Sequence, residues 1–128
     1  NPVMRVGAQI AEGITLHEHL SKKDAEEKAK KMLEMVGIPG SRYRDYPHQF
    51  SGGMKRRLSL LRALLVPFDL LILDEPFNGL DSENRKKAAA LVRNRAQDKI
   101  LLFAAHTKED AALLGAEILC PFDSYCSV

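Results

Sequence analysis

The sequence lacks tryptophan altogether, and aromatic residues make up only 6% of its 128 positions. Few flat side chains are therefore available to stack on exposed bases, as proteins that bind single-stranded nucleic acid require. An excess of positive charge is also missing, because 19 basic residues are balanced by 17 acidic ones and the net charge is +2. Both observations argue against a nucleic-acid partner, and we expect none.

Long hydrophobic runs and cysteines are scarce as well. The most apolar stretch, residues 63–73, is interrupted by Pro67 and Asp69 and is too short to span a bilayer. We therefore expect a soluble protein that meets a membrane only through partner subunits. Cys120 and Cys126 have no histidines at metal-binding spacing, which favours two ordinary reduced thiols over a zinc site or a short disulfide loop.

What the sequence does contain is a regular alternation of helical and strand patterns after a helical first third. Residues 1–20 are weakly patterned, with an apolar repeat at Val6, Ile10 and Ile14. Ser21 with Asp24 then forms a capping box for a helix that ends before Gly37. Further helices are predicted at 54–66, 82–97 and 108–114, and strands at 70–73, 100–104 and 117–120.

The predicted strands indicate the fold class. The run 70–73 is continuously apolar, which is typical of a strand covered on both faces, and 100–104 has the same character. Strands that alternate with helices predict a parallel sheet, so the fold class is α/β.

Residues Ser51-Gly52-Gly53 precede the helix at 54–66, whose face carries the basic cluster 55–57. Two glycines allow a ligand to approach the backbone, and the amino end of a helix offers N–H groups and partial positive charge to a phosphate. A simple turn with a serine cap is the alternative interpretation. The basic cluster is interpreted as a solvated helix face.

Three further groups follow predicted strands or turns. Asp74 and Glu75 end the first strand, where one carboxylate can hold Mg²⁺ through water and the other can orient an attacking water; helix caps or solvated turn residues are the alternative. His106 follows the second strand at the same sheet edge, and a surface histidine is its alternative. Asp81, after Gly79 and Leu80, caps the next helix, which does not exclude a functional role.

Taken in this order and spacing, these motifs resemble the ATP-binding cassette (ABC) ATPases. Phe50-Ser51-Gly52-Gly53-Met54 resembles the family's signature loop, and Leu71–Pro76 resembles its Walker B strand with the catalytic glutamate. Gly79-Leu80-Asp81 resembles the D-loop, and His106 the switch histidine. The resemblance covers residues 1–118 and implies a partial P-loop NTPase fold, with a helical signature lobe followed by parallel strands and flanking helices.

The resemblance implies a role for each residue. Asp74 would hold Mg²⁺, Glu75 would polarise the attacking water, and His106 would contact the γ-phosphate of ATP. Ser51, Gly52 and Gly53 would contact ATP held by a second ABC ATPase domain, and Asp81 would act across that dimer interface.

The phosphate-gripping loop of the family, G-x-x-x-x-G-K-[ST], does not occur in these residues, because no Gly-Lys pair is present. We therefore expect a fragment or a degenerate partner that is inactive alone. Residues 1–7 and 46–50 resemble the peptide/nickel importer ATPases, whereas 73–81 resemble other importers. A divergent member and a join near residues 51–55 both remain open.

The sequence thus predicts an ATP-hydrolysing subunit of an importer, with peptides as a candidate cargo and transmembrane permease subunits as partners at the cytoplasmic face of the membrane. The predicted segments are a signature lobe at 1–66, an α/β part at 67–120 and a divergent tail at 121–128. A truncated docking module without catalysis and a soluble, non-transport ABC ATPase are the alternatives.

Overall fold

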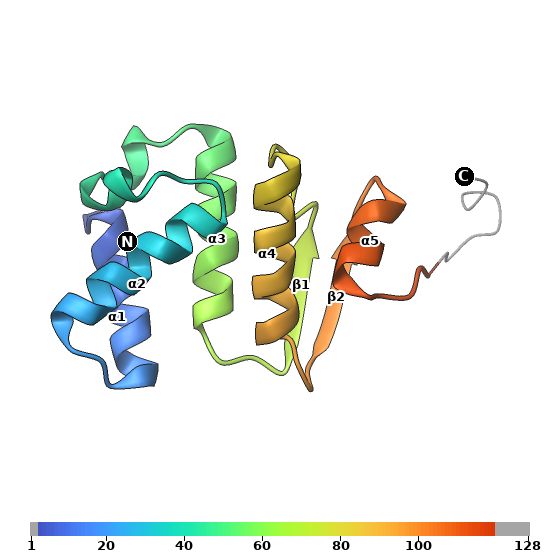
Figure 1. Cartoon of the computed structure of the whole chain (residues 1–128), viewed down its shortest axis with the longest axis horizontal. Helices are drawn as coiled ribbons and strands as arrows, with labels where there is room; N and C mark the ends of the chain where they lie inside the picture. Colours follow the sequence, from blue (N-terminus) through green and yellow to red (C-terminus); the bar gives the residue numbers. More distant parts are fainter. Residues whose placement is uncertain (1–2, 120–128) are drawn as a thin grey trace.

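The computed structural model describes residues 3–119. A helical part comes first in the chain and an α/β part second (Figure 1). In chain order the elements are α1 (Val6–Glu18), α2 (Lys22–Met35), the 3-10 turns η1 (Gly40–Arg44) and η2 (Pro47–Gln49), α3 (Gly52–Leu65), β1 (Leu70–Asp74), α4 (Ser82–Arg95), β2 (Ile100–Ala104) and α5 (Lys108–Leu114).

Helix α2 confirms the helix predicted from its capping box. The N–H of Asp24 donates to Oγ of Ser21 over 3.1 Å, and the hydroxyl of Ser21 donates to Oδ2 of Asp24 over 2.6 Å. An N-terminal cap of this type stabilises a helix by about 1 kcal/mol. Ala25, Ala29 and Leu33 of its apolar stripe are at most 1% exposed, so packing against the core stabilises α2 in addition to its cap.

Helix α1 is more regular than its weak sequence pattern predicts. Val6, Ile10 and Ile14 are at most 1% exposed and form one face of a 13-residue helix. A Cβ on Gly7 would come within 2.3 Å of the ring of Tyr43 in η1, so glycine is required for that close approach. The packing of three apolar residues and one glycine therefore stabilises α1, although its other side chains give only a weak helical pattern.

The two strands are parallel, and α4 connects them. Their register runs from Leu70 opposite Ile100 to Asp74 opposite Ala104. The predicted order of strand, helix, strand and helix is confirmed from β1 to α5. The third strand is not: residues 116–119 form no strand, and Cys120, like Cys126, lies outside the described residues. Within residues 3–119, β2 pairs with β1 alone and its other edge has no strand beside it.

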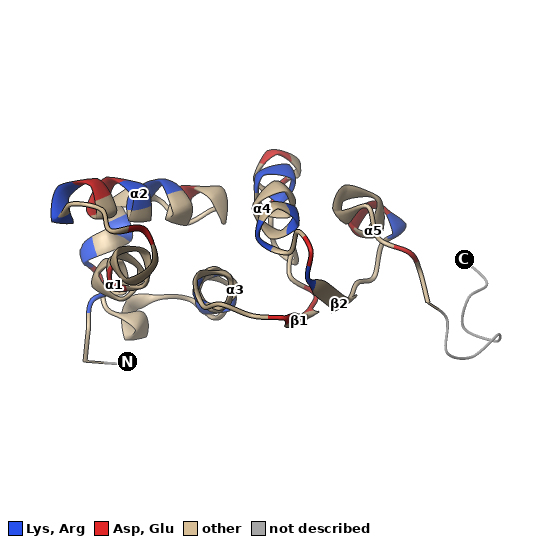
Figure 2. Cartoon of the chain, turned by 90° about the horizontal axis from the view of Figure 1, so that it is seen from below, with Lys and Arg blue, Asp and Glu red and all other residues tan. Residues whose placement is uncertain are grey.

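Only one face of this sheet is covered, so the prediction of strands buried on both faces is wrong for residues 3–119. Both α4 and α5 lie on the same side of the sheet, and no described helix lies below it (Figure 2). Leu71 and Leu73 point to the covered side and are buried. The other face carries large apolar side chains that are 47–69% exposed, namely Leu70, Ile72, Ile100 and Leu102. An unbroken apolar run indicates that both faces of a strand avoid water. It does not show whether this chain itself provides the helices that would cover the second face.

A continuous apolar core joins the helical part to the α/β part. Leu61 and Leu64 of α3 and Val92 of α4 are completely buried in it. Burying a side chain of this size contributes about 1.5–3 kcal/mol, so these contacts outweigh the individual caps. No helix within residues 3–119 combines the length and hydrophobicity needed to cross a bilayer. The division into 1–66, 67–120 and 121–128 stays a prediction, and its last segment lies outside the described residues.

The exposed sheet face generates a prediction about association in solution. We expect the 128-residue chain to form oligomers, because the open face and the free edge of β2 both favour pairing with another chain. Replacing Ile72 and Leu102 together by threonine places β-branched side chains, which suit strands, at both positions but removes apolar area, and should shift the chain towards monomer. Size-exclusion chromatography with light scattering measures this.

The control for that experiment is Leu16→Gln on α1. Leu16 is as exposed as Ile72, at 70% against 69%, but it lies on a helix away from the sheet. Its substitution should leave the association state unchanged. A sharp monomer peak for the unchanged chain, with cooperative melting, would contradict the prediction.

Candidate functional site

All the predicted site residues belong to elements that meet at one edge of the molecule, the upper edge in Figure 1. At this carboxyl edge β1 and β2 end, while α3 and α4 begin. Ligands bind at the carboxyl ends of parallel strands, and helix amino ends favour anions there. The predicted residues on these element ends are Ser51, Gly52, Gly53, Asp74, Glu75, Asp81 and His106.

Asp74 is the last residue of β1, and Glu75 follows it in an unusual backbone conformation. Glu75 has a φ of 45°, in the left-handed region, while its N–H donates to the carbonyl oxygen of Ala104 over 2.8 Å. A left-handed non-glycine residue costs free energy, and His19 and Asp98 have the same conformation away from this edge, so the backbone of Glu75 alone does not identify a site. The Asp74 side chain remains exposed, whereas that of Glu75 is half-buried.

The structure brings Glu75 together with His106. Nε2 of His106 contacts Oε1 of Glu75, so the imidazole either donates a hydrogen bond or, when protonated, forms an ion pair. The side chain of His106 is 83% exposed, against 27% for Glu75. The sequence predicted a shared sheet edge for these residues, and the tertiary structure adds this direct contact. A carboxylate and an imidazole in contact can together orient water and an anionic group.

Ser51 caps α3, as the simpler interpretation of this motif predicts. Its Oγ accepts a hydrogen bond from the N–H of Met54 over 3.3 Å. Gly52 and Gly53 are exposed, and a Cβ at either position would meet nothing within 4 Å. Neither has a positive φ, so packing and conformation in this chain would both tolerate a side chain.

The two glycines therefore have no explanation within the described fold. Glycine in a helix costs about 0.5–1 kcal/mol relative to alanine, so the pair at Gly52 and Gly53 weakens α3. The absence of side chains instead leaves the first N–H groups of the helix accessible to a ligand. Within residues 3–119 no hydrogen bond or ion pair joins Ser51–Gly53 to Glu75 or His106.

Asp81 is the N-cap of α4. Its Oδ1 accepts from the N–H of Asn84 and its Oδ2 from Nδ2 of the same residue, both over 2.8 Å. These hydrogen bonds, the backbone one first, lower the pKa of the Asp81 carboxyl below its usual value, so it stays ionised at neutral pH. Gly79, with a φ of 79°, makes the tight turn that precedes it.

Arg57 has contacts that the sequence pattern did not reveal. Its Nε donates to the carbonyl oxygen of Gly53 over 3.3 Å, and its Nη1 to that of Gly37 over 3.4 Å. The interpretation of residues 55–57 as a solvated face is therefore wrong for Arg57, which is half-buried. The residue connects the start of α3 with the end of α2. Charge pattern alone could not have found it, because both acceptors are backbone atoms.

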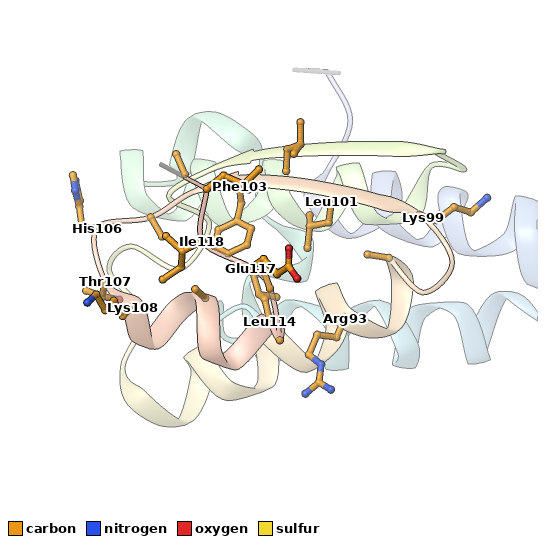
Figure 3. A pocket seen from close by; sticks show the side chains of 18 residues that line it. Arg93, Lys99, Leu101, Phe103, His106, Thr107, Lys108, Leu114, Glu117 and Ile118 are labelled. Carbon is orange, nitrogen blue, oxygen red and sulfur yellow. The ribbon is translucent and has the colours of Figure 1, made fainter. Parts of the chain in front are cut away.

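A groove of about 1010 Å³ follows the free edge of β2 and separates it from α5 and residues 115–119. Phe103 and Ile118 line its apolar part, and Lys99 lies at one end (Figure 3). His106 lies at the other end and points away from the groove. The groove thus runs along β2 and reaches the carboxyl edge only at its His106 end, and neither Asp74 nor Glu75 lines it.

Comparison with known proteins identifies the family. Residues 3–78 match the family model described as ABC transporter. The dipeptide transport ATP-binding protein of Bacillus subtilis is 47% identical over 83 residues, covering 63% of this chain and 25% of the relative. The oligopeptide transport ATP-binding protein of the same organism is 39% identical over 110 residues, covering 83% of this chain and 31% of the relative.

A glutathione import ATP-binding protein of Pectobacterium atrosepticum is 37% identical over 123 residues. That match covers 93% of this chain, so it extends over Asp81 and His106, and 20% of the relative. The chain thus spans between a fifth and a third of the length of these three relatives. The family model matches more than half of the chain, and it includes Ser51–Gly53, Asp74 and Glu75. The chain therefore belongs to the ABC transporter family, as a partial α/β ATPase domain that resembles those of peptide importers.

Proposed function

We propose that the chain supplies the hydrolytic edge of an ATP site in a peptide importer. The observation that carries the proposal is the contact between Glu75 and His106, beside Asp74, at the carboxyl edge. Two relatives named for dipeptide and oligopeptide transport support peptides as the cargo. Transmembrane permease subunits are then the partners, with the chain at the cytoplasmic face of the membrane.

The donor set at this edge fits Mg²⁺ bound together with a nucleotide. Asp74 offers an exposed carboxylate, and within residues 3–119 no group of three or more acidic, histidine or cysteine side chains forms a cage. Magnesium keeps several waters and is usually bound by one or two carboxylates plus phosphates, so a single aspartate suffices. When bound, the ion neutralises charge on the phosphate oxygens.

Glu75 and His106 divide the remaining chemistry. The Glu75 carboxylate orients a water and takes its proton as the water oxygen bonds to the γ-phosphorus and the bond to the bridging oxygen breaks, leaving ADP and phosphate. The imidazole of His106 donates to a γ-phosphate oxygen. The left-handed backbone of Glu75 fixes the base near the strand end instead of along the strand.

Ser51–Gly53 and Asp81 serve a second copy of the domain in this proposal. The N–H groups at the start of α3 are accessible, and no hydrogen bond within residues 3–119 directs them towards Glu75. A phosphate held by a facing subunit would reach them, and Asp81 would lie at the interface between the two copies. The site is then complete only in a two-fold dimer.

Without a partner that supplies a phosphate-binding loop, we expect the 128-residue chain to hydrolyse no ATP. The reason is that the loop contributes most of the phosphate contacts, and no Gly-Lys pair occurs in this sequence. A steady-state phosphate-release assay on the purified chain measures the outcome. Turnover that Glu75→Gln abolishes would overturn this expectation.

The roles of the two adjacent carboxylates are separable in a longer protein that joins this chain to a phosphate-binding loop. Glu75→Gln keeps shape but removes the base, so hydrolysis should fall by about 10²–10⁴-fold while nucleotide binding persists. Asp74→Asn removes a charged metal ligand, so Mg²⁺-dependent nucleotide affinity should fall together with hydrolysis. Phosphate release and nucleotide titration measure the two effects.

Light scattering with ATP and Mg²⁺ adds an independent readout. Glu75→Gln should accumulate as an ATP-bound dimer of doubled mass, whereas Asp74→Asn should not. Glu12→Gln, on the exposed surface of α1, is the matched control and should behave like the parent. If Glu75→Gln turns over ATP at the parent rate, Glu75 is a strand-end residue without a catalytic role.

A further inference from the structure

Asp110 is the one polar or charged residue within residues 3–119 whose overall exposure, 8%, places it in the core. Burying a carboxylate is costly unless a cation or hydrogen bonds compensate it. Its own N–H donates to Oγ1 of Thr107 over 3.4 Å, which caps α5, but this does not satisfy the carboxylate. The chain therefore maintains a buried charge at the start of α5 that helix capping alone does not explain.

The compensating cation comes from another helix. Nη1 of Arg85, in the first turn of α4, lies 3.5 Å from Oδ1 of Asp110. Both side chains are largely shielded, at 28% and 12% exposed. Within the described part of the chain, Nε of Arg85 and Oδ1 of Asp110 are buried without a hydrogen-bond partner. The pair is thus a long, incompletely satisfied ion pair, a type of contact that native proteins seldom retain without a reason.

The location of the pair gives that reason. Arg85 follows the cap residue Asp81 by four positions, and Asp110 follows His106 by four positions. Arg85 thus lies one helical turn from Asp81, and Asp110 lies in the first turn of α5, which begins two residues after His106. Since α4 and α5 pack on the same side of the sheet, the ion pair joins the first turns of the two helices (Figure 2).

We propose that the Arg85–Asp110 pair is a positioning element that fixes His106, and with it the Glu75–His106 contact, relative to the turn at Asp81. The catalytic consequence of this inference rests on the proposed function, whereas the positioning of His106 by the ion pair does not. Movement of α4 at the dimer interface is transmitted through Arg85 to the start of α5. The unsatisfied Nε and Oδ1 atoms leave room for the pair to tighten when the two helices move together.

The first test uses the 128-residue chain labelled selectively at histidine, so that the NMR spectrum contains ring signals from only four residues. Asp110→Asn and Arg85→Met should each displace the ring signals of His106 and leave those of the other histidines in place. The matched control is Asp24→Asn, because Asp24 also occupies the third position of its helix and its N–H also donates to the N-cap side chain, but its own side chain is exposed. His106 signals that stay in place for Asp110→Asn would overturn the inference.

A second variant covers the case in which a lone buried charge prevents folding. The double substitution Arg85→Met with Asp110→Leu removes both charges and fills similar volume, which proteins often tolerate without loss of stability. We expect a melting temperature close to that of the unchanged chain, with the His106 signals still displaced. Signals that return to their original positions along with the melting temperature would reduce the pair to a structural contact and overturn the proposal.

The catalytic consequence is measured in a longer protein that joins this chain to a phosphate-binding loop. Asp110→Asn should lower kcat for ATP hydrolysis about 3- to 30-fold, with KM changed less than about twofold, because positioning acts after the nucleotide has bound. Asp110→Glu keeps the charge and should recover most of the rate. Asp24→Asn should turn over ATP like the parent.

The reference variant Glu75→Gln separates the two ideas. If it abolishes turnover while Asp110→Asn matches Asp24→Asn, the positioning role is wrong and the proposed function stands. If Glu75→Gln turns over ATP at the parent rate, the proposed function is wrong, whereas the histidine spectra still decide whether Arg85 and Asp110 position His106.

Discussion

Parallel pairing of β1 with β2 is the constraint on which the carboxyl edge depends. Because the strands run in the same direction, Asp74 lies opposite Ala104 and both strands end at one edge. The hydrogen bond from the N–H of Glu75 to Ala104 extends this pairing by one residue beyond β1. An antiparallel pair would send His106 to the opposite end of the sheet, and its contact with Glu75 could not form.

Helix caps at this edge serve both stability and the proposed chemistry. The Ser51 oxygen and the Asp81 carboxylate each accept a backbone N–H at the start of a helix, which stabilises α3 and α4. The same caps fix the start of α3 and the turn before α4, which the proposed function places at the interface with a second copy. A capped helix start is therefore a poor discriminator between a structural and a functional serine or aspartate. Gly52 and Gly53 discriminate better, because they weaken α3 without relieving any clash in the described fold.

The end of α2 links the helical part to this edge. A Cβ on Gly37, whose φ is 74°, would lie 2.9 Å from Cδ2 of Leu80 and 3.0 Å from Nη1 of Arg57. One glycine thus meets both the turn before α4 and the arginine that contacts Gly53. Since these contacts lie in or against a close-packed core, a shift of α2 would move the start of α3 and the turn before α4 together.

Local rules explain how much of the protein could be predicted from its sequence. Capping at Ser21, Ser51 and Asp81 depends on atoms three residues apart, so the starts of α2 and α4 could be predicted, and that of α3 was placed at residue 54, two residues after its start at Gly52. The sequence shows two apolar runs, now β1 and β2, with a helix between them. This order predicted that the strands pair in parallel and end at one edge of the sheet. The family resemblance rested on the same local motifs, and the match over residues 3–78 confirms it.

Other features depend on segments far apart in the chain, and only the tertiary structure decided them. The contacts of Glu75 with His106 and of Arg85 with Asp110 span 31 and 25 residues, and no local pattern links such partners. The exposed face at Ile72 and the absence of the predicted strand over 117–119 depend on which layers surround the sheet, whereas hydrophobicity indicates only that a strand avoids water. The sequence by itself determined the elements and their order, because hydrogen bonding and periodicity act over one or two turns. Packing over longer distances decided which side chains meet at the edge.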